Sequence, residues 1–334
     1  MLATPQAAHA LPVQLLTSGS TTSPDHAPLG LDVKGSVFVR ARHRTIGEGD
    51  PTTRLDLNRA RLSLKLSYGE LLQLKISPDL DEAPYLADAY LEVRPLDELR
   101  FRVGQQKVPF GQLEWRSRWD IPTVNRGIVT NQLSRRLGFS DRRVGALGEV
   151  RVKAWPLKPS LELGVFDNGD VNDRYDVAAR LTVKPLKGAD VAVAYYRREE
   201  AKISGGAGQA GQLSVEYQKH RFWILAEVLV GRARRLTLDG VPIAEDATFL
   251  GARGIVAYSF KFDAFRAQPY VGAEVLDPGL KTTSDLGYSV RGGVNLLFLE
   301  RLRLSLEAER TDGPAAFVLP ESTTLTMFLG MRVG

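Results

Sequence analysis

The sequence contains no cysteine and only four histidines, which are scattered along the chain. Without cysteine the chain cannot form a disulfide framework, a thiolate zinc site or a cysteine nucleophile. Four scattered histidines also argue against a metal centre built from several histidines. We therefore expect no metal, no other cofactor and no catalytic residues.

A long apolar run is also missing. The longest one, Phe222–Val230, is interrupted by Glu227, whereas a membrane-spanning helix needs about 20 predominantly apolar residues. The mean hydropathy of −0.16 would fit a soluble protein. It would equally fit a membrane β-barrel, in which only every second residue of a strand faces lipid. Composition does not separate these two classes of protein. The periodicity of apolar and polar residues is therefore needed to distinguish them.

The excess of positive charge is small. The chain has 44 Lys and Arg against 39 Asp and Glu, which gives a formal net charge of +5. A nucleic-acid-binding protein usually concentrates more basic residues into one run. We therefore expect no nucleic-acid partner.

The first residues differ from the rest of the chain. Ala8-His9-Ala10 matches the small-x-small pattern of a signal-peptidase site, but no charged and apolar segments precede it. The stretch 17–28 is rich in Ser, Thr and Pro, which is also typical of a disordered leader. Under either interpretation we expect residues 1–29 to lie outside the fold and residues 30–334 to form one domain.

From residue 33 onward the dominant pattern is alternation of apolar and polar residues. In Arg61–Ser67 and in Arg301–Ala308, leucine occupies every second position, with Arg, Lys, Ser or Glu between. Such a period of two is typical of strands with one apolar and one polar face. The pattern predicts sixteen strands, near residues 31–42, 54–67, 70–79, 84–94, 98–107, 143–154, 159–167, 174–184, 189–199, 211–219, 221–231, 248–260, 266–276, 285–297, 301–310 and 323–334.

The connections between these strands alternate between short and long. The long ones are expected near residues 43–53, 108–142, 200–210, 232–247, 277–284 and 311–322. Short turns at one rim and long loops at the other are typical of a transmembrane β-barrel. Closure of the sheet satisfies every strand hydrogen bond, which lipid could not do. We therefore predict an all-β, closed antiparallel barrel with lipid outside and water inside.

Aromatic residues near the predicted strand ends favour the same fold. Outer-membrane barrels carry aromatic girdles at both membrane interfaces, although aromatic residues are common in any strand. The candidates are Tyr68, Phe110, Trp155, Phe166, Phe222, Trp223, Tyr258, Phe260, Tyr270 and Phe298.

The longest connection, residues 108–142, is rich in arginine. Between Gly111 and Arg143 there are seven arginines and three acidic residues, a net charge of +4. Folded into the lumen, such a loop would attract anions, because basic residues select anions in pores. The candidate anion-contacting residues are Arg116, Arg118, Arg126, Arg135, Arg136, Arg142 and Arg143.

Basic residues on the polar faces of the strands could extend this positive path along the lumen. By parity alone they are Arg61, Lys65, Arg100, Arg102, Arg151, Lys153, Arg180 and Lys184. Glu216, Glu227, Glu274 and Glu307 fall on polar faces as well, so some arginines could instead form structural ion pairs. The sequence leaves the role of each individual arginine open.

Around this loop the chain resembles the phosphate-selective porin O and P family of bacterial outer-membrane proteins. The similarity is carried by Gly104-Gln-Gln-Lys-Val-Pro-Phe-Gly111, by Glu114, Arg118-Trp-Asp120, Arg126 and Asn131, by Asp141-Arg-Arg-Val-Gly145, and more weakly by 164–172 and 179–185. The resemblance implies a sixteen-stranded, trimeric channel in the outer membrane whose third long loop folds inward. It also implies that basic residues at the constriction pass phosphate-like anions.

Two features depart from the family pattern. The chain ends at Met331-Arg-Val-Gly334, whereas barrels of this kind usually end in an aromatic residue. The predicted lumen charges are mixed, so we expect a general porin with a preference for anions such as phosphate rather than strict phosphate selectivity.

Other motifs and functions fit less well. Asp167–Asp173 lacks the twelfth-position Glu of a calcium loop, and Gly205–Gly211 lacks the lysine of a phosphate-binding loop, so it is interpreted as a flexible loop tip. Two alternatives remain: an outer-membrane barrel with a plugged lumen acting as an enzyme or adhesin, and a soluble β-sandwich. A passive channel without enzyme activity is the function that we expect.

Overall fold

The computed structural model describes residues 29–81, 85–131, 137–168, 174–199, 207–238, 241–280, 286–313 and 321–334. Within these ranges the chain forms one sheet of 17 antiparallel strands, in which β1 pairs with both β2 and β17. The sheet is therefore a closed barrel, as predicted. Residues 1–28 of the predicted leader (1–29) lie outside the described residues, whereas Leu29 belongs to β1 and not to the leader.

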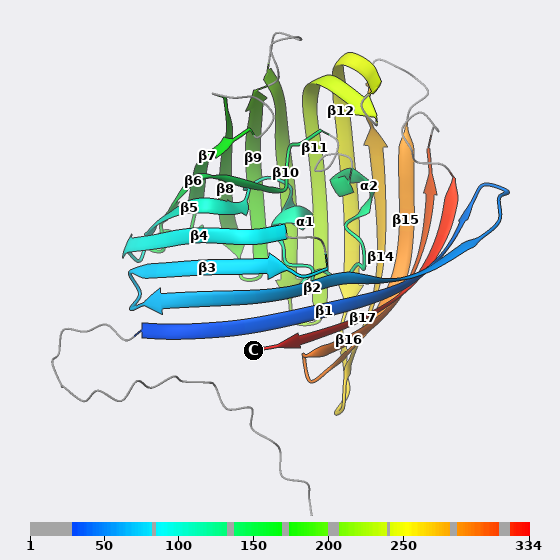
Figure 1. The fold of residues 1–334 in the computed structure, drawn as a ribbon, viewed down its shortest axis with the longest axis horizontal. Helices are drawn as coiled ribbons and strands as arrows, with labels where there is room; N and C mark the ends of the chain where they lie inside the picture. Colours follow the sequence, from blue (N-terminus) through cyan, green and yellow to red (C-terminus); the bar gives the residue numbers. More distant parts are fainter. Residues whose placement is uncertain are drawn as a thin grey trace, which may run out of the picture.

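The strands follow one another around the barrel in chain order (Figure 1). They are β1 (Leu29–Ile46), β2 (Thr52–Tyr68), β3 (Leu72–Asp79), β4 (Tyr85–Leu96), β5 (Leu99–Lys107), β6 (Arg142–Arg151), β7 (Ser160–Asp167), β8 (Tyr175–Leu186), β9 (Ala189–Glu199), β10 (Ala207–Lys219), β11 (Phe222–Leu238), β12 (Val241–Tyr258), β13 (Phe260–Lys261), β14 (Arg266–Asp277), β15 (Gly287–Phe298), β16 (Leu302–Asp312) and β17 (Ser322–Val333). The short β13 prolongs β12 along the same partner, β14, so the described strands make a sixteen-membered barrel.

The predicted strands are confirmed, with two corrections to the loops. Residues 232–247 were expected to form a long loop, but β11 and β12 continue through most of this stretch and pair with each other up to Leu238 and Val241. The glycine-rich stretch that was interpreted as a loop tip belongs to β10 from Ala207 onward. In both places cross-strand pairing overrides weak local strand propensity.

The barrel is apolar outside and polar inside. In β17 the outward side chains of Met327 and Leu329 are 51% and 44% exposed, whereas the inward Thr326 is 3% exposed. In β16 the inward Arg303, Ser305 and Glu307 are buried. An apolar outer band of this kind is what a barrel in lipid requires. The alternation in the sequence therefore predicted both faces correctly.

Aromatic rings gather at the rim that carries the short turns. Phe222 and Tyr258 lie 4.8 Å apart between ring centroids, as do Tyr258 and Phe260. Phe222 and Phe260 are exposed, as are Tyr68 and Trp155, in agreement with a girdle.

Four of the predicted girdle residues are placed elsewhere. They are Phe110, Phe166, Trp223 and Tyr270, and all four are buried inside the barrel. They belong to apolar clusters formed between the barrel wall and the chain that enters the lumen. Their burial corrects the prediction. These four aromatic residues pack against the chain that enters the lumen and do not lie at the membrane interface.

Candidate functional site

The connection between β5 and β6 folds into the barrel. This inner loop, described at residues 108–131 and 137–141, contains the one-turn helices α1 (Gln112–Trp115) and α2 (Gly127–Thr130), which lie within the ring of strands in Figure 1. Its apolar residues are almost inaccessible, with Leu113 and Val129 at 0% exposure. Among the described residues, neither helix is long and apolar enough to cross a membrane.

Buried carboxylates on the barrel wall hold the inner loop by its backbone. Glu227 accepts a hydrogen bond from the Gln112 N–H at 2.6 Å. Glu307 accepts one from Val124 and Glu274 one from Val129, each at 3.0 Å. The loop has little regular structure, so its N–H groups need partners of this kind.

Buried arginines on the same wall bind the backbone carbonyls of the loop. Arg303 donates to the carbonyl oxygens of Ile121 at 2.8 Å and of Pro122 at 2.6 Å. Arg291 donates to the Asn125 carbonyl at 3.0 Å and Arg253 to the Arg126 carbonyl at 3.1 Å.

Two of these wall arginines also pair with the wall carboxylates. The distance is 2.5 Å from Arg253 to Glu227 and 3.2 Å from Arg291 to Glu274. The charges on strands β11–β16 are thus used to fix the loop.

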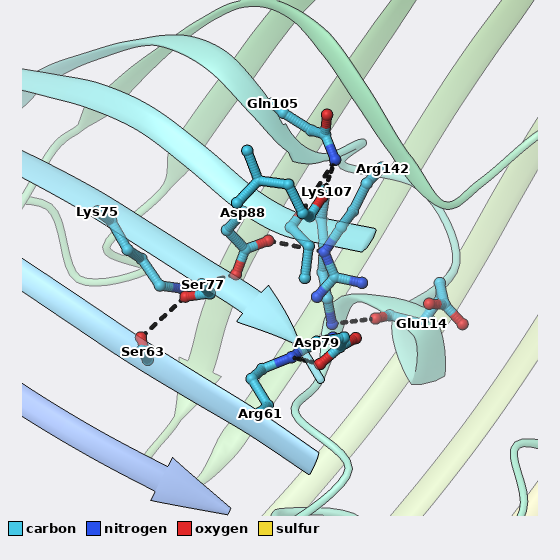
Figure 2. Close-up of polar contacts among 12 residues, drawn as sticks. Arg61, Ser63, Lys75, Ser77, Asp79, Asp88, Gln105, Lys107, Glu114 and Arg142 are labelled. Carbon is cyan, nitrogen blue, oxygen red and sulfur yellow. Dashed lines mark hydrogen bonds and ion pairs between the residues drawn. The ribbon is translucent and has the colours of Figure 1, made fainter. Parts of the chain in front are cut away.

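The opposite side of the loop is attached less extensively. Lys107, the last residue of β5, donates to the carbonyl oxygens of Glu114 at 2.6 Å and of Arg116 at 2.9 Å, which lie at the C-terminal end of α1. A cation suits this position because the carbonyl groups at a helix end carry partial negative charge. Figure 2 shows Lys107 pointing toward Glu114 beside the Asp88–Arg142 pair.

The lumen stays open between the inner loop and strands β1–β6, and the open space extends to the ends of β16 and β17. One cavity of about 1010 Å³ and a second of about 330 Å³ lie here. The larger one includes Arg44 and Ser322 near the long-loop rim, and the smaller one includes Ser77 and Tyr90 deeper in the barrel. Five residues line both cavities, and all five are arginines: Arg59, Arg61, Arg118, Arg126 and Arg142. We call this ring the arginine neck.

Three arginines of the neck are paired with carboxylates. Arg61 donates to Asp79 at 2.5 Å, and Arg142 donates to Asp88 at 2.7 Å. Figure 2 shows both pairs. The third pair joins Arg126 to Glu114 at 2.9 Å, within the inner loop itself.

The remaining two neck arginines are not neutralised. Arg118 donates to the amide oxygen of Asn58, and no carboxylate of the described residues lies within ion-pair distance of Arg118 or Arg59. Burial, together with the nearby charges of Arg59 and Arg126, lowers the pKa of Arg118 from its ordinary value to about 9. Arg118 therefore remains protonated at neutral pH, and the neck carries uncompensated positive charge.

The inner-loop pair is also charged at neutral pH. Burial alone would raise the pKa of Glu114, but the charges of Arg126 and Lys107 outweigh it and lower the pKa below its ordinary value. Burial lowers the pKa of Arg126 although Glu114 opposes this shift. The neck thus contains fixed charges of both signs, with arginine in excess.

The seven arginines predicted at the constriction have different environments. Arg118, Arg126 and Arg142 line the neck. Arg116 pairs with Glu216 at 2.7 Å, and Arg143 lies 3.7 Å from Asp176, so these two support the loop instead of facing the open lumen. The remaining two, Arg135 and Arg136, lie outside the described residues.

The structure brings only some residues of the predicted basic path to the open lumen. Arg61 and Arg102 line the open cavities, and the partly exposed Lys65 forms no ion pair with a described residue. Arg100 is instead enclosed between Glu92 and Glu149, and Arg180 is buried against Gln112 of the inner loop. These two corrections have one cause. In each case a carboxylate or the inner loop contacts the guanidinium group and keeps solvent away from it.

The other three residues of the path lie toward the short-turn rim. Arg151, the last residue of β6, pairs with Glu149. Lys153 lies beyond the end of β6 and pairs with Asp97 at 3.0 Å, and Lys184 lies 3.7 Å from Asp190. Lys153 was expected on a strand, so its placement in the turn is a further correction.

Four cavity-lining arginines were missed by the sequence analysis: Arg40, Arg42, Arg44 and Arg59. The first three alternate with other residues in β1, so a period of two could have found them. Arg59 has the parity of Arg61 and Lys65, so alternation could have found it as well. The lumen residue that alternation could not find is Asn58, because the pairing of β1 with β2 shifts by one residue at Phe38/Val39. This β-bulge lets both Asn58 and Arg59 line the lumen, which strict alternation forbids.

The fold is that of known outer-membrane channels. Salmonella typhi OmpF, in complex with daunomycin, is 13% identical with a TM-score of 0.66, covering 91% of this chain and 97% of its own. The channel DcaP of Acinetobacter baumannii is 12% identical with a TM-score of 0.65, covering 92% and 98%. An anion-selective porin from Comamonas acidovorans is 9% identical with a TM-score of 0.63, covering 92% and 100%.

The family model of phosphate-selective porin O and P matches residues 38–220, more than half of the chain. Among curated protein sequences, none matches this one. The matched region includes the second half of β1, strands β2–β6, the inner loop and every residue of the arginine neck. The chain therefore belongs to the phosphate-selective porin O and P family and is a porin of the bacterial outer membrane, a channel rather than an enzyme.

Proposed function

We propose that this porin lets small hydrophilic solutes diffuse passively across the outer membrane and prefers anions such as phosphate. The observation that carries the proposal is the arginine neck, in which Arg59 and Arg118 have no carboxylate partner among the described residues. A permeating anion can replace the missing partner, because the planar guanidinium donates to two oxygens of a phosphate or carboxylate. Cations meet the same charge as a barrier.

The charge balance of the larger cavity supports a preference rather than strict selectivity. Eight arginines line it, against the six acidic residues Asp56, Asp79, Asp81, Glu114, Asp141 and Glu309. Several of these charges cancel in pairs, as in Arg40 with Asp56. The name of the family and the anion selectivity of the similar porin from Comamonas acidovorans agree with anion passage.

The test is the reversal potential of the purified protein in a planar bilayer under a KCl gradient. We expect the sign of anion preference for the unaltered chain, with chloride replaced by phosphate in a second series. The double variant R59Q/R118Q is expected to reduce the anion-to-cation permeability ratio at least several-fold, because it removes the two unpaired charges of the neck.

The matched control removes two arginines from outside the lumen. In R197Q/R310Q the replaced side chains are exposed, at 54% and 62%, and each pairs with a glutamate. This variant is expected to keep the permeability ratio of the unaltered protein. Cation preference of the unaltered chain, or an unchanged ratio in R59Q/R118Q, would refute the proposal.

We further propose a homotrimer in the outer-membrane lipid, with the apolar outer face shared between lipid and neighbouring copies. One of the similar structures, OmpT of Vibrio cholerae, is described as a trimer form. Light scattering in detergent, corrected for bound detergent, tests this: a mass of one chain would contradict it.

A further inference from the structure

A third cavity, separate from the arginine neck, lies on the other side of the inner loop. It has a volume of about 260 Å³ and shares no lining residue with the two cavities of the neck. Residues that are close in the loop divide between the two sides: Trp115 and Arg118 face the pore, whereas Arg116 and Trp119 line the third cavity.

The third cavity lies at the short-turn rim. Its lining includes Arg221 between β10 and β11, Glu300 between β15 and β16, and Arg332 near the end of β17. In outer-membrane barrels the short turns are periplasmic. We therefore call this cavity the periplasmic pocket.

The periplasmic pocket is strongly positive. Five arginines line it (Arg116, Arg221, Arg266, Arg303 and Arg332), against two acidic residues, Asp120 and Glu300. Two of the arginines are paired: Arg116 with Glu216 at 2.7 Å and Arg266 with Glu300 at 2.9 Å.

The other three have no carboxylate within 4.0 Å among the described residues. Arg303 is fully occupied by the inner loop and contributes charge only. Arg332 is held in place, with its guanidinium 4.7 Å from the Trp119 ring and its Nε 2.9 Å from the Glu300 carbonyl oxygen. Arg221 is exposed in its turn. Arg221 and Arg332 are therefore the groups that can bind an anion.

The size and the walls of the pocket indicate the class of ligand. Its volume corresponds to about nine water molecules at ~30 Å³ each, which exceeds the space that inorganic phosphate needs. Ile121, Trp223 and Leu297 provide an apolar wall opposite the charged groups. A ligand with a charged oxyanion and a carbon skeleton would use both surfaces.

We propose that the periplasmic pocket is a second binding site, specific for small organic oxyanions, that captures a phosphorylated or carboxylated solute after it has passed the neck. The proposal rests on the anion preference proposed above for the supply of such solutes, but the site itself uses different residues. Binding there would hold the solute at the periplasmic exit, beside the pore and not within it.

Titration calorimetry on the full-length protein in detergent tests the pocket. The probes are glucose 6-phosphate, glucuronate, inorganic phosphate and uncharged glucose. We expect glucose 6-phosphate or glucuronate, or both, to bind more tightly than inorganic phosphate, and glucose not to bind. The double variant R221Q/R332Q is expected to weaken binding of the organic anion at least fivefold.

Two further variants separate this site from the neck. R59Q/R118Q is expected to lose the KCl reversal potential and to keep the affinity for the organic anion, whereas R221Q/R332Q is expected to do the reverse. The exposed turn variant R221E gives a second test if the double variant fails to fold, which migration of unheated samples on a denaturing gel reports. Unchanged affinity in R221Q/R332Q or R221E, or no binding of either organic anion to the unaltered protein, would overturn the proposal.

Discussion

The two sides of the lumen use the same residue types for opposite purposes. On strands β11–β16, Arg253, Arg291 and Arg303 are buried and bind the inner loop. On strands β1–β6, Arg59, Arg61 and Arg142 line open space. Both sets occupy inward positions of alternating strands, so parity is not what distinguishes them. The difference arises from the inner loop, which packs against one wall and leaves the other facing solution.

The largest loss of stability is expected when a buried charged side chain on strands β11–β16, the wall that holds the inner loop, loses its ion-pair partner. Glu227 binds both Arg253 and the Gln112 N–H and is buried. Removing one member of a buried ion pair costs about 3–5 kcal/mol, so E227A should lower the free energy of unfolding by that amount. Urea unfolding of the protein in detergent measures it.

The control for this prediction comes from the open wall. Asp56 pairs with Arg40 and is 34% exposed. Exposed ion pairs contribute about 0–1 kcal/mol, so D56A should change the free energy of unfolding by less than about 1 kcal/mol. Equal losses in the two variants would show that the walls do not differ in this way.

A smaller loss of stability is expected from substituting Gly127, the glycine at which the inner loop packs against the barrel wall. Gly127 has a φ of +82°, and an added Cβ would lie 1.9 Å from the Glu274 carboxylate. A left-handed backbone alone costs an alanine about 1–2 kcal/mol, so G127A should destabilise the protein by at least this much and displace α2. Single-channel conductance, recorded beside urea unfolding, should change with it.

Gly254 provides the matched position for this substitution. It lies on β12, and an added Cβ would meet nothing within 4 Å. G254A should therefore leave both the conductance and the stability unchanged. If G127A behaved like G254A, the fit between loop and wall would be looser than the contacts imply.

The smallest effect is a change in ion selectivity. It is expected from removing one charge on strands β1–β6, the wall that faces the open lumen, without changing the size of the side chain. D79N keeps a polar partner beside Arg61 but removes its neutralising charge. The anion-to-cation permeability ratio should rise roughly twofold, which corresponds to the few tenths of a kcal/mol typical of partly solvated pairs. The reversal potential measures this ratio.

The control D97N acts on an exposed pair with Lys153 outside the neck and should leave the permeability ratio unchanged. A lower ratio in D79N would indicate that Asp79 acts by positioning Arg61 and not by neutralising it.

The sequence predicted the barrel well, because the alternation of side chains is a property of each strand alone. Length and composition predicted a long, positively charged connection after the fifth strand, and the family resemblance implied that it folds inward. It could not predict which arginines face water, since this depends on contacts between distant segments, such as Arg180 with Gln112 or Arg100 with Glu149. Alternation also could not place Asn58 beside Arg59 in the lumen, because the β-bulge at Asn58 reverses the parity of β2 upstream of it.

That bulge has a consequence for engineering the pore. Upstream of it, Leu55 and Leu57 are exposed on the outer face, and downstream Leu66 is exposed there too, although its parity differs from theirs. One inserted residue therefore lets both Asn58 and Arg59 face the lumen at the level of the arginine neck, without exposing a charge to lipid. Strand length, as well as residue identity, is thus a variable through which evolution or design can tune ion selectivity in such a barrel.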